Sequence, residues 1–203
     1  MAPTPALIAA CITCLLFAGC TSSTASTPAT SPSPTSPVTA SAFPSPSVSV
    51  TSSLSSDQAA GVAAVDKYRA AINRIGSNPA AFSKAEMTAI LSKVAGGKVV
   101  PANVGAYVDL KKRGFRYDGD SIVVSTKVSR PSKATYGTEV VVTRCMDQRG
   151  LRVLDRSDAE VDAAKLGFTV PDFNLRQYAV VRRTGTKEFL VYGLASATGE
   201  CGP

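Results

Sequence analysis

The sequence YGTEVVVTRCM, residues 136–146, predicts the strongest β-strand of the chain, because β-branched residues fill its centre. Side chains alternate between the two faces of a strand, so Val140 and Val142 are expected to lie on one face. The opposite face takes Glu139, Val141, Thr143 and Cys145. We expect this strand to belong to an antiparallel meander.

Further strands are predicted on both sides of it. Ser121–Val128 is rich in β-branched residues. Asn174–Arg183 and Lys187–Ala197 are expected to pair as a hairpin across Thr184-Gly185-Thr186. Shorter elements, two extended pieces and one helical turn, are expected at residues 115–118, 151–154 and 158–165.

The residues before these strands predict helices. Ser56 or Asp57 is expected to be the N-cap of a helix through about Ile75, in which apolar residues recur at helical spacing and form a single stripe. The stripe consists of Val62, Val65, Tyr68, Ile72 and Ile75.

Two shorter helices are expected to follow. Ser83-Lys84-Ala85-Glu86 is a capping box that begins the second helix, and its buried face takes Met87, Ile90, Leu91 and Val94. Pro101 fits the first turn of a third helix, which ends before Gly114. The order of elements predicts an α+β fold: two to three N-terminal helices packed on a curved antiparallel sheet of four to six strands.

Residues 1–19 predict a lipoprotein signal peptide. The apolar segment Ala6–Ala18 is shorter than the roughly 20 residues that a membrane-spanning helix needs. It ends in LFAGC, residues 16–20, and small residues directly before a cysteine are what a lipoprotein signal peptidase recognises. We expect cleavage before Cys20 and diacylglycerol on its sulfur, which would hold the chain at the extracytoplasmic face of the cell membrane. The alternative is an ordinary secretory signal, in which Cys20 is incidental.

Residues 20–56 are predicted to form a disordered tether. After Cys20 the tether consists mainly of Ser, Thr, Pro and Ala and has no charged residue, so it buries too little apolar surface to offset the entropy of ordering. All 22 Lys and Arg and all 15 Asp and Glu follow Ser56, which leaves residues 57–203 as one globular domain with a net charge of +7. This excess suits contact with anionic lipids or wall polymers, or it is simply a solvated basic surface.

Two cysteines would remain beside the lipidated one after export, Cys145 and Cys201. Because an exported chain meets an oxidising compartment and the count is even, we expect them to form a disulfide. The alternative, a free nucleophilic cysteine, would have no histidine to activate it, since the chain contains none.

The order of the elements, Tyr68-Arg69 in the first helix and Cys145-Met146-Asp147 at a strand end together resemble the nuclear transport factor 2-like fold, also called SnoaL-like or cystatin-like. More narrowly, the chain is similar to uncharacterised lipoproteins and secreted proteins of actinobacteria, in which a Cys-x-Asp and a near-terminal cysteine such as Cys201 recur. The resemblance implies a cone-shaped cavity between helices and sheet. That fold includes isomerases, dehydratases and pure binding modules, so it does not define the function.

The sequence offers no established catalytic motif. Without histidine there is no Ser-His-Asp triad and no imidazole metal site, and no phosphate-binding glycine loop is present. The kind of catalysis that remains possible uses a carboxylate or a tyrosine inside a cavity. The candidate residues for it are Glu139, Asp109, Asp118, Tyr107, Tyr117 and Tyr136. An acidic run is read as a solvated loop, because it lacks the glycine and glutamate of a calcium-binding hand: Asp155, Asp158, Glu160 and Asp162. Lys111-Lys112-Arg113 and Arg182-Arg183 could contact phosphate of lipid or polymer, and nucleic acid is not an expected partner outside the membrane.

Three functions are compatible with these observations, and none calls for a metal or cofactor. The first is a non-enzymatic binding or interaction module at the membrane, with a membrane or wall partner or a second copy of itself. The second is a carrier for a small apolar ligand, and the third is an enzyme of the isomerase or hydratase kind. A cone filled by side chains favours the first, an apolar cavity without a buried carboxylate favours the second, and one with a buried carboxylate favours the third.

Overall fold

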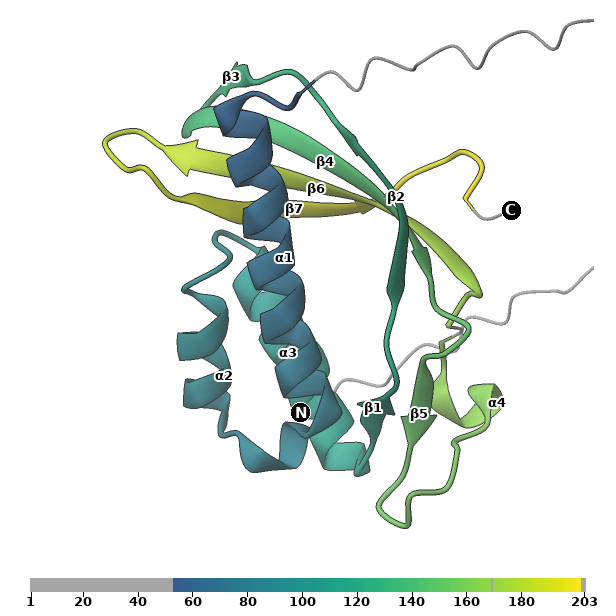
Figure 1. Cartoon of the computed structure of the whole chain (residues 1–203). Coiled ribbons are helices and arrows are strands. Elements are labelled where there is room, and N and C mark those ends of the chain that lie inside the picture. The colour runs from purple at the N-terminus through teal and green to yellow at the C-terminus, as the bar shows by residue number, and fades with distance from the viewer. Residues whose placement is uncertain (1–52, 169, 202–203) are drawn as a thin grey trace, which may run out of the picture. The chain divides into compact units, whose positions relative to one another are not determined.

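The computed structural model describes residues 53–168 and 170–201, which belong to a unit spanning Val50–Pro203. The predicted signal peptide, Cys20 and nearly all of the predicted tether lie outside the described residues. The described part is an α+β fold, with three helices packed against an antiparallel sheet (Figure 1). The helical elements are α1 (Ser56–Ser77), η1 (Pro79–Ala81), α2 (Lys84–Leu91), α3 (Val99–Arg113) and α4 (Ala163–Leu166).

The main sheet has five strands in the order β2-β4-β6-β7, with β3 pairing beside β4 as well. These strands are β2 (Ile122–Val128), β3 (Ser132–Ala134), β4 (Gly137–Asp147), β6 (Phe173–Arg183) and β7 (Phe189–Ser196). β4 and β6 pair along their whole length, from Gly137 opposite Arg183 to Asp147 opposite Phe173. The predicted long strand is therefore central, and the prediction of four to six antiparallel strands is confirmed.

A second, two-stranded sheet lies apart from the main one. It pairs β1 (Arg116–Asp118) with β5 (Arg152–Leu154). Both segments were predicted as extended, but they pair with each other and do not extend the meander. Ion pairs from Arg116 to Asp118 and Asp158, and from Arg152 to Asp118, add to this pairing.

The inner face of the main sheet forms the core with the helices. Val140 and Val142, predicted to share a face, are fully buried there, next to Val180 and Val191 of the neighbouring strands. Helix α1 packs close to this face at Gly61, where an added Cβ would lie 3.2 Å from Val140 Cγ1. The predicted apolar stripe of α1 is confirmed, because all five of its residues are buried or packed against this core.

The helix ends follow local sequence rules. The N-cap of helix α1 is Ser55, one residue before the predicted N-cap positions Ser56 and Asp57, and its side chain forms a reciprocal capping box with the Gln58 side chain. The predicted box of Ser83 and Glu86 is confirmed at the start of α2. Helix α3 ends at Gly114, which adopts the left-handed conformation that a glycine tolerates without strain.

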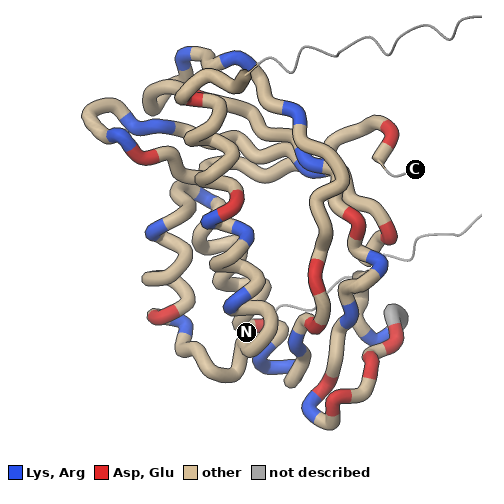
Figure 2. The backbone as a smooth tube through the Cα atoms, in the orientation of Figure 1, with Lys and Arg blue, Asp and Glu red and all other residues tan. Residues whose placement is uncertain are grey.

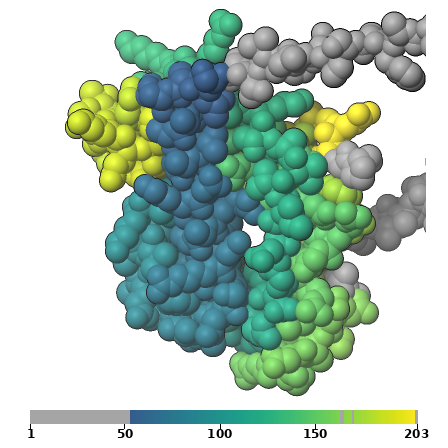
Figure 3. All heavy atoms as spheres, viewed as in Figure 1, coloured from purple at the N-terminus to yellow at the C-terminus, as the bar shows by residue number. Residues whose placement is uncertain are grey.

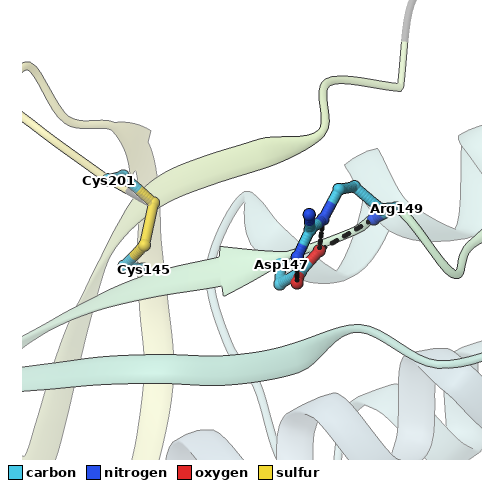
Figure 4. Close-up of a disulfide and its surroundings, with 4 residues drawn as sticks. All are labelled: Cys145, Asp147, Arg149 and Cys201. Carbon is cyan, nitrogen blue, oxygen red and sulfur yellow. Dashed lines mark hydrogen bonds and ion pairs between the residues drawn. A yellow bond between two sulfur atoms is a disulfide. The ribbon is translucent and has the colours of Figure 1, made fainter. Parts of the chain in front are cut away.

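The predicted disulfide between Cys145 and Cys201 is present and ties the C-terminal segment to the outer face of β4 (Figure 4). Two residues further on, the Asp147 carboxylate accepts hydrogen bonds from the backbone and the guanidinium of Arg149, and these bonds hold the pKa of Asp147 below its ordinary value. In the Cys-x-Asp motif the cysteine therefore forms the disulfide, and the aspartate forms a turn with Arg149. Within the described ranges, no helix is both long and apolar enough to cross a membrane.

Candidate functional site

The inner face of the sheet changes from apolar to polar along its length. On β4 the inward alternation runs Val140, Val142 and then Arg144, and on β6 it runs from Val180 through Tyr178 to Arg176. Arg144 lies directly opposite Arg176 in the register of these two strands. The apolar half is covered by helices, whereas the polar half faces an open space.

That space is a cavity of about 510 Å³ between α1, α3, the β1–β2 turn and the inner face of the sheet. Figure 3 shows its opening between α1 and the segment that includes β2. Its apolar wall is formed by residues such as Ile72, Leu110, Met146 and Leu151. Four tyrosines line the same cavity: Tyr68, Tyr107, Tyr117 and Tyr178.

Backbone packing positions these tyrosines. A Cβ on Gly76 would lie 2.8 Å from the Tyr117 ring and 3.3 Å from the Tyr107 ring, so the absence of a side chain there makes room for both. The rings of Tyr68 and Tyr178 meet edge to face at 6.2 Å between centroids. The Tyr68 hydroxyl donates to Asn103 Oδ1 at 3.2 Å, which fixes its direction.

The tyrosine hydroxyls are neutral donors at physiological pH. Burial raises the pKa of Tyr68 to about 12, and it raises the pKa of Tyr107 further still. Burial is also the main cause of the raised pKa values of Tyr117 and Tyr178. Removal of a phenol from water disfavours the phenolate, so these groups are suited to hydrogen bonding and not to acting as bases.

Three arginines gather at the polar end of the inner face. Arg144 is only 3% exposed, and its Nη1 lies 2.6 Å from Oδ1 of Asp66 on α1. Arg69 donates through Nη2 to the Ser121 carbonyl at 2.8 Å, and burial lowers its pKa. Arg176 lines the cavity, and within residues 53–168 and 170–201 its side chain has no ion pair or hydrogen bond.

Negative charge is sparse in the lining. Among the described residues, the only carboxylate there is Asp120, which is exposed. The amide oxygen of Gln148 is buried in the lining and has no hydrogen-bond partner in that part of the chain. No cluster of metal-binding side chains occurs among the described residues either.

The six predicted catalytic candidates do not converge. Tyr107 and Tyr117 line the cavity, but Asp118 belongs to the small sheet, and Asp109 forms a loose pair with Arg113. Tyr136 is exposed and stacks on Tyr192. Glu139 lies on the outer face of β4, opposite Val181.

Members of the predicted acidic loop and basic clusters form contacts within the fold. Asp155 accepts hydrogen bonds from Ser157 and Ala159 within its own turn. Arg113 donates to the carbonyls of Lys165 and Leu166, while Arg182 pairs with Asp57 at the start of α1. Figure 2 shows acidic and basic positions interspersed around the small sheet and the loop after β5.

The sequence reasoning missed Arg144, Arg176 and Tyr178. The signal that could have found them is the inward alternation of β4 and β6, in which polar residues continue the register of the buried valines. Tyr68 was predicted only as a member of the apolar stripe. Its hydroxyl, at the edge of that stripe, reaches the cavity.

Comparison with known proteins supports the fold. No family model and no curated protein matches the chain. Its structure is similar to that of the intermembrane space region of the chloroplast protein ARC6, with 11% identity and a TM-score of 0.50, over 72% of this chain and 100% of that one. At this identity the similarity shows the α+β fold alone. A de novo β-sheet design protein also matches, with 19% identity and a TM-score of 0.28, over 67% of this chain and 86% of that one.

Proposed function

We propose that this chain is a lipoprotein anchored through Cys20 at the extracytoplasmic face of the cell membrane, and that its domain is a non-enzymatic binding module. The cavity is the binding site of that module, and its occupant is a small molecule, so the carrier is favoured among the three functions considered from the sequence. The observation that carries this proposal is a cavity of about 510 Å³ where a filled cone would have favoured a purely surface-based interaction. Helices over a curved sheet with a cavity between them also support a relationship to the nuclear transport factor 2-like fold.

Binding is favoured over catalysis by the lining. An isomerase or hydratase of this kind needs a carboxylate perturbed by an apolar pocket. Asp120, the carboxylate found in the described lining, is exposed, and the tyrosines are neutral donors. Donors around an apolar wall hold and orient a molecule without transferring its protons.

Anchoring is supported by the sequence LFAGC and by the disulfide, which fits an oxidising compartment. In a host that processes lipoproteins, the mature protein should begin at Cys20, carry diacylglycerol and sediment with membranes. Cys20→Ala should lose both the lipid and the cleavage before residue 20, because the peptidase recognises the cysteine. A wild-type protein that is exported but never lipidated would favour the secretory alternative.

Ligand binding is tested with the exported full chain carrying Cys20→Ser, so that neither lipid nor detergent competes. The neutral fluorescent probe N-phenyl-1-naphthylamine should bind, and Ala106→Trp should abolish binding, because Ala106 lines the cavity. The matched control is Ala102→Trp, one turn earlier on α3 and outside the lining. Equal binding by both variants would refute the cavity as the site.

Self-association is a second candidate function, favoured by the edge strand β2. Ile122 and Val124 are 65% and 51% exposed, and no strand among the described residues pairs with the outer edge of β2. The opposite edge is covered, because Val94 and Gly96 hydrogen-bond to Val191 of β7. An open apolar edge pairs readily with another strand, and a second copy offers the same strand in antiparallel orientation. Sedimentation velocity should show a dimer that Val124→Lys converts to monomer; a monomeric wild type would end this proposal.

A further inference from the structure

We propose that the cavity selects molecules with an anionic group on an apolar or aromatic body, and that Arg176 contacts the anion. This inference rests on the proposed function, since it names the class of ligand for the same cavity. Carboxylate, sulfonate and phosphate groups share the required chemistry, whether on a free amphiphile or on a lipid headgroup.

Positive charge is unbalanced at the polar end of the inner face. Arg144 and Arg176 lie opposite each other on neighbouring strands, where like charges repel. Asp66 neutralises Arg144 at 2.6 Å. Arg176 has no such partner within the described residues; it lines the cavity and is exposed to solvent. A bound anion would supply the missing counter-charge.

Hydrogen-bond donors converge on the cavity. Burial is the largest influence on the pKa of Tyr68, Tyr107, Tyr117 and Tyr178, and the positive charge of Arg176 acts against it at all four. One guanidinium therefore lies within electrostatic reach of four phenols that line the same space. The Tyr68 hydroxyl already donates to Asn103, so the donors left for a ligand are those of Tyr107, Tyr117 and Tyr178. A planar guanidinium beside neutral hydroxyl donors is suited to oxyanion recognition, because its hydrogen bonds to an anion are charge-assisted.

The apolar wall and the Gln148 amide are suited to the rest of the ligand. The wall beside these donors is formed by Ile72, Leu110, Met146 and Leu151, which would exclude water from an apolar or aromatic body. Gln148 presents a buried amide oxygen without a hydrogen-bond partner among the described residues. A hydroxyl or amide on the ligand would satisfy that acceptor, since buried acceptors left unpaired are costly.

The experiment compares two probes that share an aromatic frame and differ in one anionic group. The probes are 8-anilino-1-naphthalenesulfonate and its neutral counterpart N-phenyl-1-naphthylamine, titrated into the exported full chain carrying Cys20→Ser. We expect the sulfonate to bind about tenfold more tightly, in line with a charged hydrogen bond. Arg176→Gln should reduce the preference to about one, and Arg176→Lys, which keeps the charge, should retain part of it.

The matched control is Arg183→Gln, on the same strand but on the outer face. It removes the same net charge and should leave the preference unchanged. Equal binding of the two probes to the wild type, an unchanged preference in Arg176→Gln, or an equal loss in Arg183→Gln would each overturn the inference. The proposed function would stand in those cases; it fails if neither probe binds, or if Ala106→Trp and Ala102→Trp bind the neutral probe equally. Thermal unfolding of each variant confirms that the probes report on folded protein.

Competition then separates the two sources of the anion. Decanoate represents a free amphiphile, decanol is its neutral control, and dihexanoylphosphatidylglycerol below its micelle concentration represents a lipid headgroup. Displacement of the sulfonate probe by decanoate and not by decanol supports a free anionic amphiphile, and displacement by the phospholipid supports a lipid. Displacement by neither anion, or by decanol as readily as by decanoate, would contradict the selection of anionic amphiphiles.

Discussion

Asp66 is expected to stabilise the fold far more than its exposed position implies. Its carboxylate is 58% exposed, but the Arg144 side chain that it neutralises is only 3% exposed. Arg144 Nε already has no hydrogen-bond partner among the described residues. Asp66→Asn would leave a buried guanidinium without its counter-charge and beside Arg176.

The magnitude follows from this asymmetry. Breaking a buried ion pair by removing one partner costs about 3–5 kcal/mol. We take the lower end, about 3 kcal/mol, because water already reaches the aspartate side of the pair. In a domain of this size, such a loss would lower the melting temperature by about 10 °C.

The assay is a double-mutant cycle measured by urea unfolding. Arg144→Met removes the buried charge together with its need for a partner, so its free energy of unfolding should lie within about 1 kcal/mol of the wild type or above it. The double variant Asp66→Asn/Arg144→Met should match Arg144→Met alone, which gives a coupling energy of about 3 kcal/mol. Asp109→Asn, which removes a loose surface pair with Arg113, is the control and should cost less than about 0.5 kcal/mol. A cost below about 1 kcal/mol for Asp66→Asn, or costs that simply add in the double variant, would refute this reasoning.

Three further results are expected. Replacement of Cys145 and Cys201 together by serine opens a loop closed across 56 residues and should lower the free energy of unfolding by about 4 kcal/mol in urea titrations, whereas an unchanged value would show that the tail is held by other contacts. Gly61→Leu should lower the free energy of unfolding by more than about 2 kcal/mol, and Gly105→Leu should lower it much less, because an added Cβ at Gly61 would lie 3.2 Å from Val140 whereas Gly105 has open space around it. Equal urea midpoints for the two variants would contradict the close packing of α1. The pKa of Tyr68 in the folded protein is about 12 and exceeds its ordinary value of 10.0, so the unfolded state ionises first. The free energy of unfolding should therefore fall as pH rises from about 10 to about 12, and Tyr68→Phe should reduce that loss. An identical pH profile in wild type and Tyr68→Phe would refute the assignment.

The fold was largely predictable because its signals are local. The stripe from Val62 to Ile75, the capping box at Ser83 and the alternation in residues 136–146 each specify an element from its own sequence. The pairing of β1 with β5 was not predictable in this way. It joins short segments about 35 residues apart, and nothing in three residues specifies a partner.

The candidate site was harder to predict because its residues come from separate elements. Tyr68 belongs to α1, Tyr107 to α3 and Arg176 to β6, and each matches the pattern of its own element. Only the register of β4 with β6 brings Arg144 opposite Arg176. Sequence patterns place side chains on one face of a strand. The register of β4 with β6, however, is set by pairing between residues that lie 26 or more positions apart in the chain, so a local pattern does not specify it.

The position of Arg176 is the strongest reason to regard the cavity as functional. Elsewhere the local choices agree with one another: valines fill the covered half of the inner face, and glycines occur where α1 and the tyrosine rings pack closely. At Arg176 this agreement fails, because a second arginine continues an inward register opposite a buried one and has no described partner. Arg176 is exposed, so water solvates its charge, but folding does not call for a second arginine opposite a buried one. Such a residue is expected where a site is kept for a ligand, and here the ligand that offsets the repulsion is an anion.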